Sequence, residues 1–171
     1  MSNTTDFIPL NVAVLTVSDT RTIDTDTSGQ YLEDQLEKAG HVVSSREIVI
    51  DDLYLIRAKV SQLIADQDTH AIITTGGTGF TDRDSTPEAV EPLFDKHIDG
   101  FGELFRHLSY LEIGTSTVQS RCLAGMANKT VIFCLPGSTG ACKTAWQGCL
   151  EQQLDSTHKP CNFVPHTTAK K

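Results

Sequence analysis

Two kinds of residue in this sequence suggest chemistry on phosphate. Glycines crowd the segment Thr75-Gly76-Gly77-Thr78-Gly79, where the backbone can turn tightly and point N–H groups at an anion. Asp51 and Asp84 supply carboxylates, with no lysine close in sequence to neutralise them. Carboxylates beside a phosphate site are explained best by Mg²⁺ bridging them to phosphate oxygens. The residues therefore predict phosphoryl or nucleotidyl transfer, with Mg²⁺ at Asp51 and Asp84.

Two better-known glycine motifs do not fit this segment. A Walker-type loop needs Gly-Lys-Ser/Thr, but Phe80 follows Gly79. The dinucleotide fingerprint needs a further glycine where Asp82 stands. A strand-to-helix turn without a ligand remains an alternative. Asp26, Asp51 and Asp84 also have an alternative role, because aspartate commonly caps helices.

The composition limits the class of partner. The 171 residues carry a formal net charge of −8, which argues against non-specific binding to nucleic acid or to an anionic membrane. Five cysteines without CxxC spacing favour a reduced, cytoplasmic protein, and the scattered histidines do not suggest zinc. No apolar stretch is long enough to span a membrane.

The elements that must position these residues alternate along the chain. Apolar β-branched runs predict strands at 12–17, 42–50, 71–75 and 130–135. Helical patterns predict helices at about 27–38, 53–66, 87–94, from 100, 116–126 and 139–154, and Ser85 to Glu88 has the spacing of a capping box. We expect a polar leader at 1–9, one α/β domain at 10–155 and an irregular tail at 156–171.

This alternation predicts a mostly parallel sheet covered by helices on both faces. Polar residues follow each predicted strand: Ser18-Asp19, Asp51, Gly76 to Asp84, and Pro136-Gly137-Ser138. Ligands of open α/β sheets bind outside the carboxyl ends of the strands. We therefore expect these four segments to converge on one crevice, where helices after Asp84 and Gly137 point their N-termini at phosphate.

The motifs together resemble the MoaB/Mog family of molybdenum cofactor biosynthesis proteins, which includes the G domain of gephyrin. The resemblance covers roughly residues 8–155, and the tail around Cys161-Asn162-Phe163 is most similar to the MoaB branch. It rests on the following segments: Thr16-Val17-Ser18-Asp19, Asp26-Thr27-Ser28-Gly29, Thr74 to Gly79, Arg83 to Glu88, Ser120-Arg121 and Leu135-Pro136-Gly137-Ser138.

The resemblance implies a three-layer α/β sandwich in a homo-oligomer, trimer or hexamer, that binds molybdopterin. In catalytic members, ATP and Mg²⁺ are used to adenylylate the terminal phosphate of molybdopterin, with release of pyrophosphate. The alternative is a non-catalytic molybdopterin-binding or scaffold protein that passes the pterin to other enzymes of the pathway. A third hypothesis is a nucleotide-binding regulator unrelated to pterin.

The resemblance also carries roles to individual residues. Asp84 and Asp51 become the metal-binding and catalytic carboxylates. Ser18, Ser120 and Arg121 are expected on the pterin side, and Arg83 or Arg121 is expected to offset charge on the departing pyrophosphate. The nucleotide and pterin phosphates would lie against two turns, formed by Gly76, Gly77, Thr78 and Gly79 and by Pro136, Gly137 and Ser138. Asp19 and Thr75 are the other residues expected to bind substrate or nucleotide.

Overall fold

The computed structural model describes residues 6–168 as one α/β domain built on a six-stranded sheet. The strand order is β2-β1-β3-β6-β5-β4. The first four strands in this order are parallel, and β5 and β4 are antiparallel additions at one edge. The strands are β1 (Asn11–Val17), β2 (Val42–Val49), β3 (Ala71–Thr75), β4 (Lys96–His97), β5 (Leu123–Ala127) and β6 (Thr130–Leu135).

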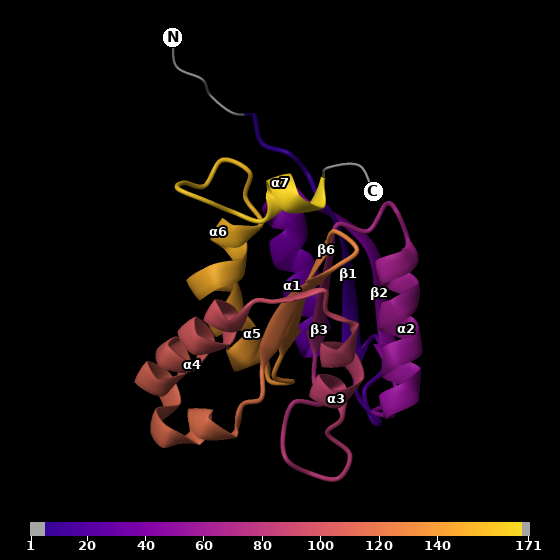
Figure 1. Ribbon diagram of the computed structural model, residues 1–171. Helices are drawn as coiled ribbons and strands as arrows, with labels where there is room; N and C mark the ends of the chain where they lie inside the picture. The colour runs from indigo at the N-terminus through magenta and orange to yellow at the C-terminus, as the bar shows by residue number, and fades with distance from the viewer. Residues whose placement is uncertain (1–5, 169–171) are drawn as a thin grey trace.

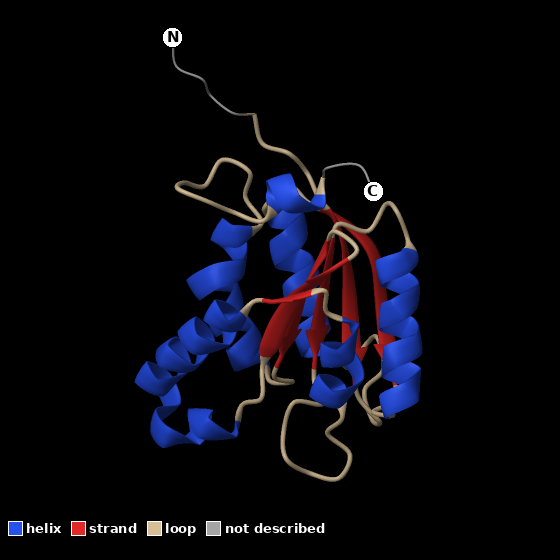
Figure 2. Cartoon of the chain, viewed as in Figure 1, coloured by secondary structure: helices blue, strands red, loops and turns tan. Residues whose placement is uncertain are grey.

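Helices cover both faces of the sheet (Figures 1 and 2). They are α1 (Thr27–Lys38), α2 (Leu53–Ala65), α3 (Thr86–Val90), α4 (Asp99–Ile113), α5 (Thr139–Ala145), α6 (Glu151–Gln153) and α7 (Val164–Thr167). Shorter turns are η1 (Glu91–Leu93), η2 (Gly114–Gln119) and the π-helical η3 (Trp146–Leu150). The helix expected at 139–154 is thus the run α5, η3 and α6.

Side-chain alternation along the strands creates two hydrophobic cores. Val12 and Val14 of β1 point to the core beneath α1, α4 and α5, whereas Ala13 and Leu15 point to the core beneath α2 and α3. Trp146 fills the first core and is almost completely buried. The predicted three-layer sandwich with a mostly parallel sheet is confirmed.

The connections place a crevice at the carboxyl end of the sheet. Strand β1 continues through α1 to β2 on one side, and β2 returns through α2 to β3 on the other side of β1. Helices α1 and α3, which follow β1 and β3, pack on opposite faces. The loops that follow β1 and β3 therefore diverge, which is the usual position of a ligand site in open α/β sheets.

One predicted helix is wrong. Residues 116–126 form the end of η2, a short extended segment and strand β5. Residues 123–127 instead pair antiparallel with β6, and Gly125 leaves room for the ring of Phe94, since a Cβ there would lie 2.3 Å from its Cγ. Strand β4, only two residues long, has no pattern in the sequence that would have predicted it.

The tail is more ordered than the sequence suggested. Val164 begins α7, is fully buried and belongs to the first core, and the ring of the neighbouring Phe163 lies 6.2 Å from that of Phe133. Residues 1–5 of the expected leader lie outside the described residues. Ile8 donates a backbone hydrogen bond of 2.8 Å to Ser156 Oγ, so the first and last described segments meet.

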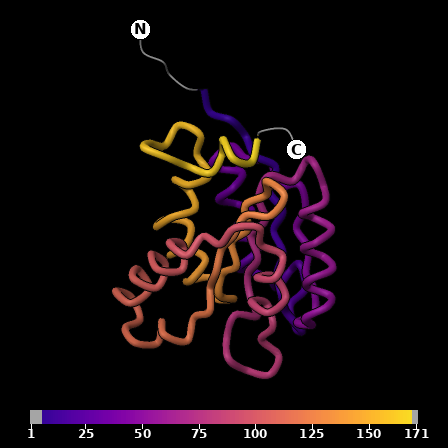
Figure 3. Tube along the Cα trace, viewed as in Figure 1, coloured from indigo at the N-terminus to yellow at the C-terminus, as the bar shows by residue number. Residues whose placement is uncertain are grey.

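These segments lie at the end of the molecule opposite the loop between β3 and α3, which protrudes at the bottom of the tube in Figure 3. No helix within residues 6–168 combines the length and apolar character needed to cross a membrane.

Candidate functional site

A cleft of about 510 Å³ opens at the carboxyl end of the sheet. The segments after β1, β2, β3 and β6 all contribute to its wall, as expected from the parallel strands. Asp19, Arg83 and Arg121 do not line it, whereas the other predicted site residues do: Ser18, Asp51, Thr75, Gly76, Gly77, Thr78, Gly79, Asp84, Ser120, Pro136, Gly137 and Ser138. The structure therefore brings both aspartates and both glycine-containing turns together.

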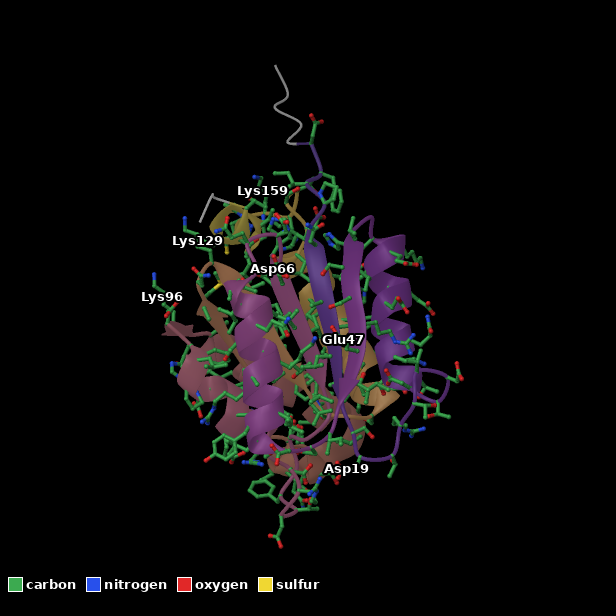
Figure 4. All side chains as sticks on the ribbon, turned by 90° about the vertical axis from the view of Figure 1, so that its right-hand side faces the viewer. Asp19, Glu47, Asp66, Lys96, Lys129 and Lys159 are labelled. Atoms are coloured by element: carbon green, nitrogen blue, oxygen red, sulfur yellow. The ribbon has the colours of Figure 1, made fainter. Side chains whose placement is uncertain are left out.

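Asp19 lies at the same end of the molecule but outside the wall of the cleft (Figure 4). Its carboxylate accepts hydrogen bonds from Arg83 Nε at 3.0 Å and Nη2 at 2.9 Å. The backbone N–H of Asp51 donates a third bond of 3.0 Å. The Arg83 bonds, helped by the Asp51 N–H, hold the pKa of Asp19 below its usual value. Asp19 thus links three loops beside the cleft.

Arg121 does not line the cleft, and its guanidinium contacts the loop after β3. Its Nε donates to the carbonyl of Gly79 at 2.8 Å, and its Nη2 donates to the carbonyl of Asp84 at 2.9 Å. Its Nη1 donates to the carboxylate of Glu88. The guanidinium is therefore bound by protein groups at the back of the loop.

The glycine turn requires glycine for its backbone shape and for space. Gly76 and Gly77 have φ of +107° and +66°, in the region that residues with a Cβ rarely adopt. A Cβ on Gly76 would lie 2.2 Å from the carbonyl oxygen of Val17. A Cβ on Gly137 would lie 3.2 Å from Cα of Gly76, so the two turns pack directly against each other.

Asp51 faces the cleft and does not cap α2. The capping role falls to Asp52, whose side chain accepts from the N–H groups of Tyr54 and Leu55. Oδ1 of Asp51 instead accepts from the hydroxyl of Ser85 at 2.8 Å and from its N–H at 3.2 Å. Burial raises the pKa of Asp51, the Ser85 bonds oppose this, and the nearby Asp84 and Asp19 charges raise it further.

Asp84 likewise does not cap a helix. Its Oδ2 accepts from Thr81 N–H at 2.8 Å and from the Thr81 hydroxyl at 2.6 Å, which closes the loop on itself. Burial alone would raise the pKa of Asp84, but the bonds from Thr81 and from the Gly79 N–H outweigh it, so the pKa lies below its ordinary value. Asp84 is therefore held as a carboxylate.

The predicted capping box at Ser85 does not form. Ser85 precedes α3, but its side chain makes no capping bond. Its hydroxyl instead donates a hydrogen bond to Asp51. The side chain of Glu88 pairs with Arg121. The residues of the expected box therefore orient the site.

Two helix N-termini meet at the cleft. Asp26 caps α1 by accepting from Gly29 N–H at 2.9 Å, which confirms its capping role, and it also lines the cleft. Ser138 caps α5 as expected, accepting from Ala141 N–H at 3.1 Å. Ser28 at the start of α1 donates a 2.9 Å bond to the Gly137 carbonyl. The positive ends of two helices thus lie beside one turn, an arrangement suited to phosphate.

The opposite wall of the cleft was not predicted. Helix α4 and η2 contribute polar side chains there: Ser109, Ser116, Thr117 and Gln119. The erroneous helix at 116–126 hid the role of Ser116, Thr117 and Gln119, whereas Ser109 lies in α4. The run of hydroxyl residues from Thr115 to Thr117 after Gly114 was the signal that could have identified this wall.

The two carboxylates suit Mg²⁺, which needs few protein ligands, better than a metal ion held by protein side chains alone. Within residues 6–168, no group of three or more His, Cys, Asp or Glu side chains could hold a metal ion. Asp51 and Asp84 nevertheless lie in one cleft and interact electrostatically. Mg²⁺ is commonly held by one or two carboxylates, with water and substrate phosphate as its other ligands. Asp51 and Asp84 meet this requirement.

Known proteins share the sequence and the fold. The family model described as a probable molybdopterin binding domain matches residues 13–156. Molybdenum cofactor biosynthesis protein B of Escherichia coli K12 is 55% identical over 162 residues, which cover 95% of each chain.

Two solved structures agree with this relationship. One, of a molybdenum cofactor biosynthesis protein B, has a TM-score of 0.83 at 46% identity and covers 86% of this chain and 92% of that chain. The other, of the tungsten cofactor synthesizing protein MoaB from Pyrococcus furiosus, has a TM-score of 0.73 at 38% identity and covers 81% and 89%. The chain therefore belongs to the MoaB/Mog family of molybdenum cofactor biosynthesis proteins.

Proposed function

We propose that this protein binds molybdopterin and adenylylates its terminal phosphate with ATP and Mg²⁺, releasing pyrophosphate. The observation that carries the proposal is the single cleft that contains Asp51, Asp84, the glycine turn and the Pro136–Ser138 turn. Backbone amides and helix N-termini can bind phosphate oxygens there, while the carboxylates suit a cation.

The proposed reaction joins a phosphate oxygen of molybdopterin to the α-phosphorus of ATP. The bond between that phosphorus and the oxygen bridging to the β-phosphate breaks, and pyrophosphate leaves with the electron pair. Asp51 and Asp84 would hold Mg²⁺, which when bound neutralises charge on the phosphates. The two turns and the N-termini of α1 and α5 would bind the phosphates and orient the reacting atoms.

Purified protein mixed with molybdopterin, ATP and Mg²⁺ tests this proposal. We expect adenylylated molybdopterin and pyrophosphate in equal amounts. In Asp84→Asn we expect a folded protein that binds molybdopterin but loses about a hundredfold or more in transfer rate, as when a charge-stabilising group is removed from an active site. Normal turnover by this variant would refute the role of the carboxylate.

A molybdopterin-binding protein without catalysis, which passes the pterin to another enzyme of the pathway, is the second candidate. Its support is the position of the arginines: Arg83 is bound to Asp19, Arg121 is bound to Glu88, and neither lines the cleft. The cation expected for pyrophosphate is therefore paired with protein carboxylates outside the cleft. The same mixture separates the two candidates, because a binder releases no pyrophosphate.

We also propose that the chain forms a homo-oligomer, a trimer or a hexamer. Large apolar side chains are exposed on α4 and η2: Tyr110, Leu111, Ile113 and Val118. A second copy packed there would bury them, and light scattering after size exclusion measures the assembly. We propose the cytoplasm as its location, since four of the five cysteines are buried free thiols.

A further inference from the structure

We infer that Arg121 is a positioning residue that holds Asp84 in place from behind the loop, rather than a residue that contacts the ligand. The inference rests on the proposed function, because it explains how the proposed metal-binding carboxylate is oriented. It replaces the ligand role that the resemblance implied for Arg121.

The bonds of Arg121 span the loop from end to end. The guanidinium donates to the carbonyls of Gly79 and Asp84, at 2.8 Å and 2.9 Å, near the two ends of the loop. The backbone N–H of Arg121 also donates to the carbonyl of Thr78 at 3.2 Å. Arg121 thereby fixes both the entry and the exit of the loop.

The interior of the loop is closed by Asp84 itself. Its carboxylate receives both bonds from Thr81, in the middle of the segment that Arg121 brackets. A movement of the Gly79 or Asp84 carbonyl would therefore displace the carboxylate. The position of Asp84 therefore depends on a closed set of contacts, here called the ring: Thr81 binds the Asp84 carboxylate, and the Arg121 guanidinium binds the carbonyls of Gly79 and Asp84.

The surroundings of Arg121 suit a structural cation. Glu88 neutralises it, and its guanidinium carbon lies 5.2 Å from the ring centroid of Phe80. A planar guanidinium can reach two carbonyls and a carboxylate at once, whereas an ammonium group has no such fixed fork.

Arg57 offers a matched control on the other side of α3. It also donates to two carbonyls, those of Ala89 at 3.1 Å and Glu88 at 2.7 Å. It also lies over an aromatic ring, 5.8 Å from the centroid of Tyr54. Arg57 does not line the cleft or contact the loop before Asp84, so Arg57→Gln removes comparable bonds without touching the proposed ring.

The test compares Arg121→Gln, Arg121→Lys and Arg57→Gln in the full-length protein. Amide hydrogen exchange of residues 79–84 without ligand measures how firmly the loop is held, and adenylyl transfer is assayed against Mg²⁺ concentration. We expect faster exchange in this loop in both Arg121 variants, with lysine showing the smaller change. We expect kcat to fall about tenfold to a hundredfold in Arg121→Gln, with more Mg²⁺ needed and an unchanged KM for molybdopterin.

Arg57→Gln should leave the exchange of residues 79–84, the Mg²⁺ requirement and kcat unchanged. Unchanged exchange of this loop in a folded Arg121→Gln, or a loss of folding in both Arg121 variants, would overturn the inference. If the wild-type protein transfers no adenylyl group, the proposed function fails, while the exchange of residues 79–84 still decides the role of Arg121.

Discussion

The hydroxyl of Ser85 and the carboxylate of Asp51 lie 2.8 Å apart, although 34 positions separate these residues in the chain. The Ser85 N–H donates to the same oxygen at 3.2 Å. Together these bonds join the loop after β2 to the start of α3. The other oxygen, Oδ2, lies 2.8 Å from where a Cβ on Gly77 would be, so it faces the glycine turn.

Replacing Ser85 by alanine should therefore weaken the site and the fold together. We expect Ser85→Ala to lower the free energy of unfolding by about 1 kcal/mol, the usual contribution of one hydrogen bond. The pKa of Asp51 should rise, because the lost bond opposes the effect of burial. Urea denaturation and carboxyl NMR measure the two effects. Ser85→Thr retains a hydroxyl and should restore both; equal behaviour of the two variants would contradict the hydrogen-bond explanation.

The two aspartates should respond oppositely to replacement by asparagine. Asp51 has a raised pKa, so the folded state binds its proton more tightly, and stability falls as pH rises from 3.8 through the folded pKa. Asp51→Asn should therefore raise Tm at pH 7 while it abolishes transfer. Asp84 has a lowered pKa, so its charge contributes stability above pH 3.8 that is lost as pH falls through the folded pKa.

Asp84→Asn is accordingly expected to lower Tm at pH 7. Differential scanning calorimetry from pH 3 to pH 7 measures both variants against the wild-type protein. The higher Tm of Asp51→Asn should disappear near pH 3, because residue 51 is then uncharged in both the variant and the wild-type protein. A lower Tm for Asp51→Asn at pH 7 would show that its burial does not disfavour the charge.

A methyl group added to the glycine turn should damage it through both backbone and contacts. Gly77→Ala should cost about 1–2 kcal/mol for the left-handed backbone alone. The added Cβ would also lie 2.3 Å from Thr86 Oγ1. Gly140→Ala is the control, because a Cβ there meets nothing within 4 Å and alanine favours the helix. Denaturation midpoints compare them, and similar losses in both variants would argue against the special geometry of Gly77.

Arg46 and Asp26 form an ion pair whose side chains are only 8% and 2% exposed, with Arg46 Nη2 3.6 Å from Asp26 Oδ2. Arg46→Ala leaves the carboxylate buried without its cation, so we expect a loss of about 3–5 kcal/mol in the free energy of unfolding. Guanidinium denaturation measures it. Lys59→Ala is the comparison, since its pair with Glu47 is more exposed and should contribute about 0–1 kcal/mol.

The sequence was sufficient for the central sheet because β1, β3 and β6 are continuous buried runs, and for the cleft because parallel strands deliver their loops to one edge. It was not sufficient to predict which of two neighbouring residues of the same type has which role. Asp51 and Asp52 have the same chemistry, yet only Asp52 caps α2. That division depends on the position of Ser85, which comes from a different part of the chain.

The Ser120-Arg121 pair shows the same limit. Ser120 has an extended backbone, in which successive side chains point to opposite sides. Ser120 lines the cleft and Arg121 faces the loop. The sequence indicated a helix there and therefore could not predict this separation. Strand β5 was missed for a related reason, since short segments rich in small residues have no clear period.

The three central strands end level with one another, since Thr16 is opposite Thr75 and Thr75 is opposite Leu135. One extra residue within any of them would advance its loop by about 3.3 Å and reverse the facing of every later side chain. Insertions and deletions in these strands should thus be tolerated far less well than substitutions on the outer helices. The lengths of the strands, and not only the identities of the residues that follow them, are part of what the chemistry requires.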